Sequence, residues 1–370
     1  MGERTHPRII SLNTMPKLLL DKEKCLRNME KMARKASRNS LSFRPHCKTH
    51  QSAEIANWFR DFDIRALTVS SFPMARYFAK AGWKDILVAF PFQPGEIANL
   101  IDLSEICDLS VLVDSPAALP FLHHIPRRIG FYIDIDTGYG RTGIRSENPD
   151  LIEQIIVKAS ANPHLEFCGF YCHAGHTYKA SSRKELDTIH QKALGDLEGL
   201  KKQFGKYAPR VLFGDTPNCS IQEEFGKIDE ITPGNFVFYD LIQCALGACT
   251  PEEIAVAMEC PVAGKYPAGE RIVIHGGAVH FSKESLLLDG AAIFGQLVER
   301  SEEGWLTAAE KRYLTSISQE HGVMERCGDL IREVNIGELL LFLPVHSCLT
   351  ANLMREYLSL DGIPITTLNS

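Results

Sequence analysis

A lysine and two histidines lie within one short segment, residues 44–50 (RPHCKTH), directly after a run with strand character. Where polar groups crowd the end of a strand, the pKa of the Lys48 ammonium can fall, so that part of it is the neutral amine. A neutral amine condenses with a carbonyl compound to form a Schiff base. Taken alone, the segment could equally be a surface loop with an ordinary solvated lysine.

Two segments rich in glycine or aromatic residues follow later strand-like runs. Residues 134–143 (DIDTGYGRTG) frame Arg141 with three glycines, which let a loop turn tightly and present the cation to a ligand oxygen. Residues 171–178 (YCHAGHTY) combine phenol and imidazole rings that suit stacking on a flat ring. The candidates in that segment are Tyr171, His173, His176 and Tyr178. The alternative interpretation is a strand end whose histidines are satisfied within the core.

Two turns with small side chains could hold a phosphate. Residues 214–220 (GDTPNCS) and 232–235 (TPGN) offer hydroxyls and accessible backbone N–H groups, at the end of the seventh predicted strand and the start of the eighth. Phosphate sites of parallel barrels commonly use these last loops. As isolated turns, neither segment would indicate any function.

His346 and Cys348 stand two residues apart in residues 344–352 (PVHSCLTAN). In a strand they would point to the same face and offer one nitrogen and one thiolate to a cation such as zinc. Two ligands are too few for a structural site, but they leave positions for water and substrate, as a catalytic Lewis acid needs. Such a pair also arises by chance in proteins without a metal.

The elements that must position these residues alternate along the chain between about residues 20 and 240. Short apolar runs alternate with amphipathic helical stretches, a pattern typical of parallel strands joined by helices. The predicted strands are residues 42–46, 66–70, 86–90, 110–113, 130–134, 167–171, 210–213 and 235–238. The predicted helices include residues 21–37, 51–59, 74–81, 96–101 and 151–160. Eight such units predict a (β/α)8 TIM-type barrel, whose catalytic groups come from the C-terminal ends of the strands.

The pattern of predicted secondary structure changes after about residue 245, where short runs typical of β-strands alternate with turns. We therefore predict a barrel over residues 20–244 and a mainly β domain over residues 245–370. The segment from Ile9 to Leu20 precedes the first barrel helix, so that about residues 1–19 are expected to join the β domain.

Composition excludes several classes of protein. The net charge of −6 and the lack of any basic run argue against a nucleic-acid partner. The eleven cysteines have no paired spacing, which indicates reduced thiols in a cytoplasmic protein. The N-terminal residues lack an apolar stretch after their charges, and no run approaches the ~18 apolar residues of a membrane span, so we predict neither export nor a membrane partner.

Taken together, these segments resemble the fold-type III pyridoxal phosphate (PLP) enzymes, and within them the D-serine dehydratase and D-threonine aldolase family with its alanine-racemase-like barrel. The resemblance covers nearly the whole chain, and its specific marks are residues 44–50 and 344–352. It implies that Lys48 carries PLP and that His346 and Cys348 bind a divalent metal, with zinc expected first.

The same resemblance implies further contacts to the cofactor. Arg141 would approach its phenolic oxygen, Tyr171 and Tyr178 would line it, and its phosphate would be held by Thr216, Gly234 and Asn235. One position departs from the family pattern: Thr232 stands where many members have an arginine before the Pro-Gly turn, so the contact to the pyridine nitrogen is not implied.

The reaction implied is that of a PLP- and metal-dependent lyase acting on 3-hydroxy-D-amino acids. In a dehydratase, Lys48 would remove the α-proton while the metal draws off the β-hydroxyl, giving a keto acid and ammonia. In an aldolase, His173 or His176 would take the hydroxyl proton as the Cα–Cβ bond breaks, giving glycine and an aldehyde. Cys348 favours the dehydratase, because family aldolases look more like His-x-Asp at the metal.

Other interpretations stay open at the level of sequence. An amino-acid racemase fits the barrel but gives His346 and Cys348 no task, and a non-catalytic PLP carrier would lack the residues after the barrel. D-Serine, D-threonine and 3-hydroxy-D-aspartate are all possible substrates. The family resemblance also predicts a homodimer, the commonest symmetric assembly of soluble enzymes.

Overall fold

The computed structural model describes residues 15–123 and 125–370 and divides into two compact units. One unit contains residues 21–255 together with 364–370, and the other contains residues 256–363 and the described residues that precede Asp21. This division differs from the sequence expectation in two respects: the boundary lies at 255/256 instead of 244/245, and the last seven residues group with the first unit. Residues 1–14, expected to join the β domain, lie outside the described part.

The first unit is the predicted barrel. Its eight strands pair in parallel in the order β3-β4-β5-β6-β8-β9-β10-β2, and a single bridge between His46 and Thr68 joins the last strand to the first. The barrel strands are Ser42–Phe43 (β2), Ala66–Val69 (β3), Asp85–Pro91 (β4), Asp108–Val113 (β5), Ile129–Asp136 (β6), Leu165–Cys172 (β8), Arg210–Phe213 (β9) and Glu230–Ile231 (β10). Short strands Ile144–Arg145 (β7) and Pro364–Thr366 (β22) also belong to this unit.

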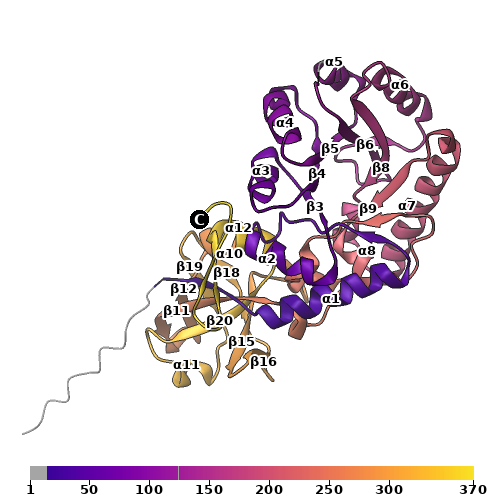
Figure 1. Cartoon of the computed structure of the whole chain (residues 1–370). Helices are drawn as coiled ribbons and strands as arrows, with labels where there is room; N and C mark the ends of the chain where they lie inside the picture. Colours follow the sequence, from indigo (N-terminus) through magenta and orange to yellow (C-terminus); the bar gives the residue numbers. More distant parts are fainter. Residues whose placement is uncertain (1–14, 124) are drawn as a thin grey trace, which may run out of the picture. The chain divides into compact units, whose positions relative to one another are not determined.

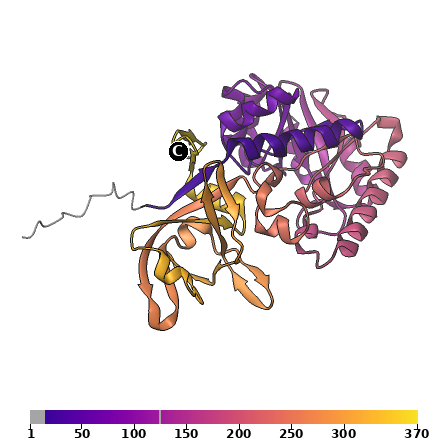
Figure 2. The same ribbon diagram turned by 90° about the horizontal axis from the view of Figure 1, so that it is seen from below.

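Helices cover the outer side of these strands (Figure 1). They are Lys22–Arg38 (α1), Ala53–Trp58 (α2), Phe72–Lys80 (α3), Ile97–Ser104 (α4), Leu119–Leu122 (α5), Pro149–Ala159 (α6), Arg183–Gln203 (α7), Thr216–Ile221 (α8) and Leu241–Ala245 (α9). Figure 2 shows α1 running along the outside of the barrel. Its N-terminus is capped by Asp21, whose carboxylate accepts a hydrogen bond from the Lys24 backbone N–H at 3.0 Å. The predicted apolar stripe of this helix is buried and consists of Cys25, Met29, Met32 and Ala36.

The eighth strand was predicted at the wrong place. Residues 235–238 do not form a strand, because Asn235–Val237 is a 3-10 helix whose Phe236 packs against Phe43 in the core. The strand is Glu230–Ile231, and its signal is hidden because a carboxylate occupies a buried position. The turn at 232–235 therefore follows the eighth strand, at the same end of the barrel as the other candidate loops.

Arg44 explains why a carboxylate is buried there. Its guanidinium donates to both carboxylate oxygens of Asp85, at 2.6 and 3.0 Å, and to Glu230 Oε1 at 3.2 Å. Burial opposes the positive charge, but Glu230 and Asp85 outweigh it and raise the pKa of Arg44. Because Asp85 and Glu230 are the first residues of β4 and β10, this network closes the end of the barrel at which those strands begin.

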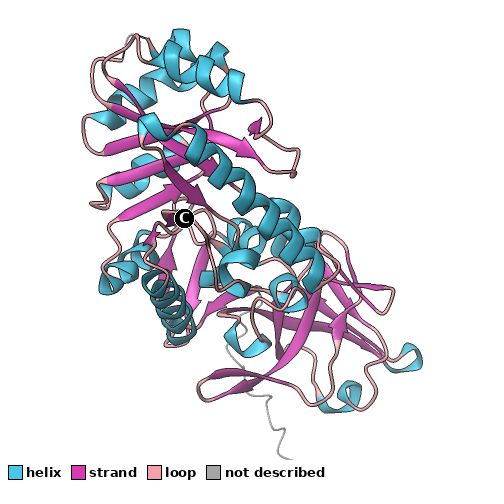
Figure 3. Ribbon diagram, turned by 90° about the vertical axis from the view of Figure 1, so that its right-hand side faces the viewer, coloured by secondary structure: helices cyan, strands magenta, loops and turns pink. Residues whose placement is uncertain are grey.

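The second unit is built mainly from strands, as predicted, and Figure 3 distinguishes them from its short helices. Its strands are Lys17–Leu20 (β1), Val256–Tyr266 (β11), Arg271–His275 (β12), Leu286–Leu288 (β13), Ala291–Ile293 (β14), Gly295–Ser301 (β15), Gly304–Thr307 (β16), Tyr313–Leu314 (β17), Ser316–Ile317 (β18), His321–Met324 (β19), Leu339–Pro344 (β20) and Glu356–Ser359 (β21). The order β16-β15-β20-β11-β1-β21 forms its main sheet. Its helices are Ala278–Phe281 (α10), Leu330–Glu333 (α11) and Ser347–Met354 (α12).

Strand β1 shows how the N-terminal segment joins this unit. It pairs antiparallel with β11 over four residues, from Lys17 opposite Glu259 to Leu20 opposite Val256.

Within the described residues, no helix is both long and apolar enough to cross a bilayer.

Candidate active site

Lys48 lies just past the point at which the barrel closes. The bridge between His46 and Thr68 is supported by the Cys47 N–H, which donates to Thr68 O at 2.8 Å, and Lys48 follows directly. The Lys48 backbone N–H donates to Nδ1 of His46 at 3.3 Å, which orients that imidazole back along its own segment. The lysine therefore stands at the C-terminal end of β2, where a parallel barrel carries its chemistry.

His173 shares this environment with Lys48 and Arg141. Its Nδ1 lies 2.6 Å from the carbonyl oxygen of Gly214, a partner that can only accept, so Nδ1 carries the proton. Burial, together with the nearby charges of Lys48 and Arg141, lowers the pKa of His173 to about 3. The imidazole is therefore neutral at physiological pH, and Nε2 keeps a lone pair that can accept a hydrogen bond.

Tyr139 connects the candidate residues, although the sequence analysis did not select it. The guanidinium of Arg141 lies 4.9 Å from the centre of its ring. The same ring meets His173 edge-on at 5.9 Å and stacks with His176 at 6.2 Å between centroids. Tyr139 thus brings together a cation and two imidazoles that were predicted from separate segments. The sequence signal that could have identified Tyr139 is its position between two glycines in residues 137–143, the loop that carries Arg141 and is called the arginine loop below.

The arginine loop is held by one carboxylate. Asp136 accepts hydrogen bonds from the backbone N–H groups of Gly138 and Gly140, at 2.9 and 3.0 Å. Both glycines have positive φ, 126° and 71°, a region that most residues with a Cβ avoid. Burial opposes ionisation of Asp136, but the N–H donors of Gly140 and Gly138 outweigh it and lower its pKa.

The two tyrosines of the sixth-strand segment lie in different surroundings. Tyr171 is 5% exposed and packs with Tyr132 and Leu212, and burial raises the pKa of its phenol. Tyr178 lies in the 3-10 helix Gly175–Lys179, with its ring centroid 6.4 Å from that of His173. Tyr178 is therefore beside the lysine and arginine cluster, whereas Tyr171 forms part of the barrel core.

The phosphate-type turns provide a small cradle near the lysine segment. A Cβ on Gly234 would come within 2.8 Å of the His46 carbonyl oxygen, so the turn approaches that segment too closely for a side chain. The Thr216 hydroxyl is buried and has no hydrogen-bond partner within the described chain. The side-chain amide of Asn235 donates to Asp240 at 2.7 Å. A buried hydroxyl that lacks a partner and a glycine turn that leaves no room for a side chain fit a ligand that carries a phosphate.

His346 and Cys348 both belong to the β-rich unit, but not to a strand. Strand β20 ends at Pro344, His346 is the N-cap of α12, and Cys348 lies in the first turn of that helix. The argument that a strand would point both side chains to one face is therefore wrong. Ser347 between them is fully buried, while the two proposed ligands are partly exposed. Their role as metal ligands stays a prediction.

A second group of metal-type donors lies in the same unit. His275 Nε2 and His280 Nε2 lie 3.5 and 4.0 Å from one carboxylate oxygen of Glu320. However, Nδ1 of His280 accepts a hydrogen bond from the Gly277 backbone N–H at 3.2 Å. The proton of the neutral ring is then on Nε2, so the nitrogen that faces Glu320 has no lone pair for a metal. Geometry brings these residues together, but the tautomer is wrong for a ligand.

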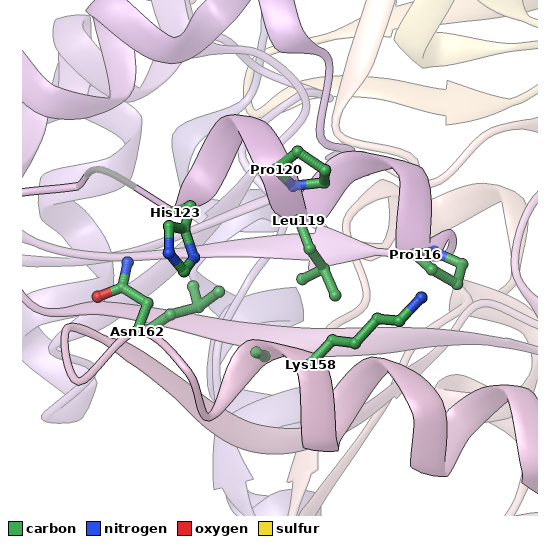
Figure 4. Close-up of a pocket in the computed structure, with 8 residues that line it drawn as sticks. Pro116, Leu119, Pro120, His123, Lys158 and Asn162 are labelled. Carbon is green, nitrogen blue, oxygen red and sulfur yellow. The ribbon is translucent and has the colours of Figure 1, made fainter.

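A cavity of about 290 Å³ opens between α5 and α6, on the outer layer of the barrel (Figure 4). Its lining includes Leu165, the first residue of β8, so it adjoins the end at which that strand begins. None of the proposed cofactor residues lines it, and we assign it no part in the chemistry. The lining residues are Pro116, Leu119, Pro120, His123, Lys158, Ala159, Asn162 and Leu165.

Two family models match separate parts of the chain. The family model for the N-terminal domain of alanine racemase matches residues 20–238. The chain belongs to the alanine racemase N-terminal domain family. A second model, "Putative serine dehydratase domain", matches residues 255–360. The predicted resemblance to the D-serine dehydratase and D-threonine aldolase branch of this fold is thereby confirmed.

Several curated relatives of this alanine racemase-like chain are lyases. A D-serine dehydratase of Dictyostelium discoideum is 28% identical, with 94% of this chain and 93% of the relative covered. A D-threo-3-hydroxyaspartate dehydratase of Delftia sp. is 26% identical, with 96% of both chains covered. A D-threonine aldolase of Arthrobacter sp. is also 26% identical, over 91% of this chain and 86% of the relative.

Solved structures confirm the alanine-racemase-like fold. The D-threo-3-hydroxyaspartate dehydratase from Delftia sp. superposes with a TM-score of 0.86 at 24% identity, covering 96% of this chain and 97% of that chain. The barrel followed by a mainly β domain, predicted from the sequence, is therefore the observed architecture.

Proposed function

We propose that this protein is a PLP- and metal-dependent lyase of 3-hydroxy-D-amino acids that acts as a D-serine dehydratase-like ammonia-lyase. The observation that carries the proposal is the group formed by Lys48, Arg141 and His173. In this group the charges of the lysine and the arginine lie close enough to a buried imidazole to lower its pKa. The lyase names of the relatives support the class of reaction.

The residues of the barrel fit PLP. Lys48 would hold the cofactor through its aldehyde carbon, Arg141 would donate to its phenolic oxygen, and Tyr178 would border its ring. Thr216, Gly234 and Asn235 would hold the phosphate, because the buried Thr216 hydroxyl lacks a protein partner and Gly234 leaves no room for a side chain. Tyr171 would contribute from the core side.

When bound, PLP withdraws electrons from the α-carbon of an amino acid and so weakens its bond to hydrogen. Lys48 would take the α-proton of the substrate. His173 would remain neutral throughout, because a pKa of about 3 keeps its Nε2 unprotonated at physiological pH. His176 would support Tyr139 by stacking and is the second candidate base.

We propose His346 and Cys348 as the metal ligands because of the donor atoms that their side chains carry. One imidazole nitrogen and one thiolate suit zinc and leave positions for a substrate hydroxyl. An ion held by these two residues would supply a Lewis acid for the β-hydroxyl of the substrate. The His275, His280 and Glu320 group is a poorer candidate because of the tautomer of His280.

The D-threonine aldolase-like reaction is the second candidate, since an aldolase occurs among the relatives. In that case His173 or His176 would take the hydroxyl proton, and the products would be glycine and an aldehyde. Cys348 favours the dehydratase outcome, because the family aldolases look more like His-x-Asp at this position. Incubating the purified protein with D-serine, D-threonine and 3-hydroxy-D-aspartate separates the two: keto acid with ammonia supports the proposal, and glycine with an aldehyde contradicts it.

We further propose a homodimer and a cytoplasmic location. The location is proposed because the eleven cysteines have no paired spacing in the sequence. A racemase or a non-catalytic PLP carrier would leave the substrate hydroxyl intact, so the same product assay distinguishes those alternatives.

A further inference from the structure

We propose that Cys244 and Cys249 are a redox modification site, where the two thiols form a reversible disulfide. Their sulfur atoms lie 3.3 Å apart, so closing a bond of about 2.05 Å requires an approach of only about 1.2 Å. Nothing in the proposed catalytic role uses either cysteine.

The local fold holds the two thiols together. Helix α9 ends in a paired turn, in which the Gly247 N–H donates to Cys244 O at 3.0 Å and the Ala248 N–H donates to Gln243 O at 2.9 Å. Gly247 has φ of +77°, which suits glycine at this position and turns the chain back toward the helix. The backbone hydrogen bonds of this turn therefore place Cys249 beside Cys244.

The two cysteines differ in exposure, and we therefore assign them different roles in the formation of the disulfide. Cys244 is partly exposed, whereas Cys249 is 8% exposed. Burial raises the pKa of the Cys249 thiol, and the adjacent Cys244 raises it further, so that Cys249 is a poor first nucleophile. Cys244 is the residue that a small disulfide in solution can reach.

The oxidant we name is a low-molecular-weight disulfide, such as glutathione disulfide. The Cys244 thiolate attacks one of its sulfurs, forming a mixed disulfide and releasing one glutathione thiolate. Cys249 then loses its proton to solvent, attacks the sulfur of Cys244 and releases the second glutathione. Two protein thiols are oxidised to one disulfide, and one glutathione disulfide is reduced to two thiols.

Asp240 links this pair to the proposed phosphate turn. The Asp240 carbonyl oxygen receives the Cys244 N–H at 3.0 Å and lies 4.0 Å from the Cys249 sulfur. Its carboxylate caps α9 by accepting from the Gln243 N–H at 3.0 Å, and it also accepts from the amide of Asn235 at 2.7 Å. Oxidation draws Cys249 away from Asp240 and shifts the first turn of α9, which disturbs the position of Asn235.

The consequence for PLP rests on the proposed function. Loss of one well-placed hydrogen bond, worth about 1 kcal/mol, would weaken PLP binding by about five-fold in the oxidised protein. The modification itself does not depend on that function, so the two are measured separately.

The test treats the full-length protein with glutathione disulfide and measures its intact mass and the peptide that spans both cysteines. We expect the loss of two hydrogens at Cys244 and Cys249, reversed by a thiol reductant. Cys249→Ser is expected to trap one glutathionyl group on Cys244, and Cys244→Ser to remain unmodified at Cys249. Cys168→Ser serves as the matched control, because it removes another partly exposed thiol and should leave the disulfide unchanged.

Failure of the native protein to lose two hydrogens, under conditions in which the unfolded chain is oxidised, would overturn the modification site. A disulfide that forms while the dissociation constant of PLP stays unchanged would overturn the link through Asp240. If the reduced protein binds no PLP but still forms the disulfide, the proposed function fails and the modification site stands.

Discussion

Asp134 and Asp136 lie two residues apart at the end of β6, and the stability of the protein should respond in opposite directions to their replacement by asparagine. Asp134 is 4% exposed, and burial raises its pKa to about 6, although a hydrogen bond from the Thr142 side chain opposes the rise. Asp136 has its pKa lowered because the N–H donors of Gly140 and Gly138 outweigh burial. We predict that Asp134→Asn stabilises the protein at neutral pH and that Asp136→Asn destabilises it.

The magnitude for Asp134 follows from proton linkage. An aspartate in the unfolded chain has a pKa of ~3.9, and each pKa unit corresponds to about 1.4 kcal/mol, so a folded value of about 6 costs about 3 kcal/mol once the group is ionised. Between about pH 4 and 6 the folded state binds more protons than the unfolded state, so stability falls as pH rises through this window. Asparagine carries no charge and keeps an oxygen that can accept from Thr142.

The opposite sign applies to Asp136. Its lowered pKa contributes stability above the pKa of the unfolded chain, and this contribution is lost as pH falls. Removing the charge weakens two hydrogen bonds to backbone N–H groups, for which we expect a loss of about 1 kcal/mol at neutral pH.

The assay is urea denaturation of the wild type and both variants at pH 4, 6 and 7.5. The free energy of unfolding of Asp134→Asn is expected to exceed that of the wild type by up to about 3 kcal/mol at pH 7.5, with the difference shrinking toward pH 4. Equal or lower stability of Asp134→Asn at pH 7.5, together with an unchanged slope between pH 4 and 6, would refute the reasoning from burial.

Four further predictions concern the proposed cofactor, metal, assembly and barrel closure. The protein should absorb near ~410–420 nm when loaded with PLP, and Lys48→Ala should lose this band and the adduct fixed by borohydride; an equally reducible adduct would contradict the role of Lys48. Chelation should abolish lyase activity while the band persists, and Cys348→Ala should behave like the chelated enzyme; full activity of metal-free Cys348→Ala would remove the metal role. Light scattering should give twice the 41.3 kDa of one chain, and a monomer at every working concentration would exclude the dimer. Arg44→Met should cost about 3–5 kcal/mol in urea denaturation, because it leaves the buried Glu230 carboxylate without its nearest cation, and a loss below about 1 kcal/mol would contradict this.

The barrel was predictable because its signals are local. The apolar run of residues 110–113 can be recognised as a strand from a few neighbouring residues, and the amphipathic stripe of α1 can be recognised as a helix in the same way. Strand β10 was missed because it has only two residues and one of them is the buried Glu230, whose burial depends on Arg44, 186 residues away in sequence. Local patterns carry no information about such a partner.

The candidate site divides in a similar way. Lys48, Arg141 and His173 could be selected by residue type, but their meeting at one end of the barrel depends on strand order. Tyr139 was missed because a tyrosine between glycines also suits an ordinary turn. The helical setting of Cys348 was missed because β20 ends only at Pro344, two residues before His346, and the apolar run before it resembles a longer strand.

The joint between β2 and β3 is the thinnest part of the barrel wall. Two backbone hydrogen bonds, Cys47 N–H to Thr68 O and Thr68 N–H to Pro45 O, hold it, whereas β3 and β4 pair over four residues. Arg44 fastens β2 to β4 and β10 at one end of this joint, and Lys48 stands at the other. Because the turn at Gly234 follows β10, a molecule attached to Lys48 and held by that turn would link the end of β2 to the end of β10. The β2–β3 joint would keep only its two backbone hydrogen bonds. The cofactor would then hold two neighbouring barrel strands together as well as take part in the reaction.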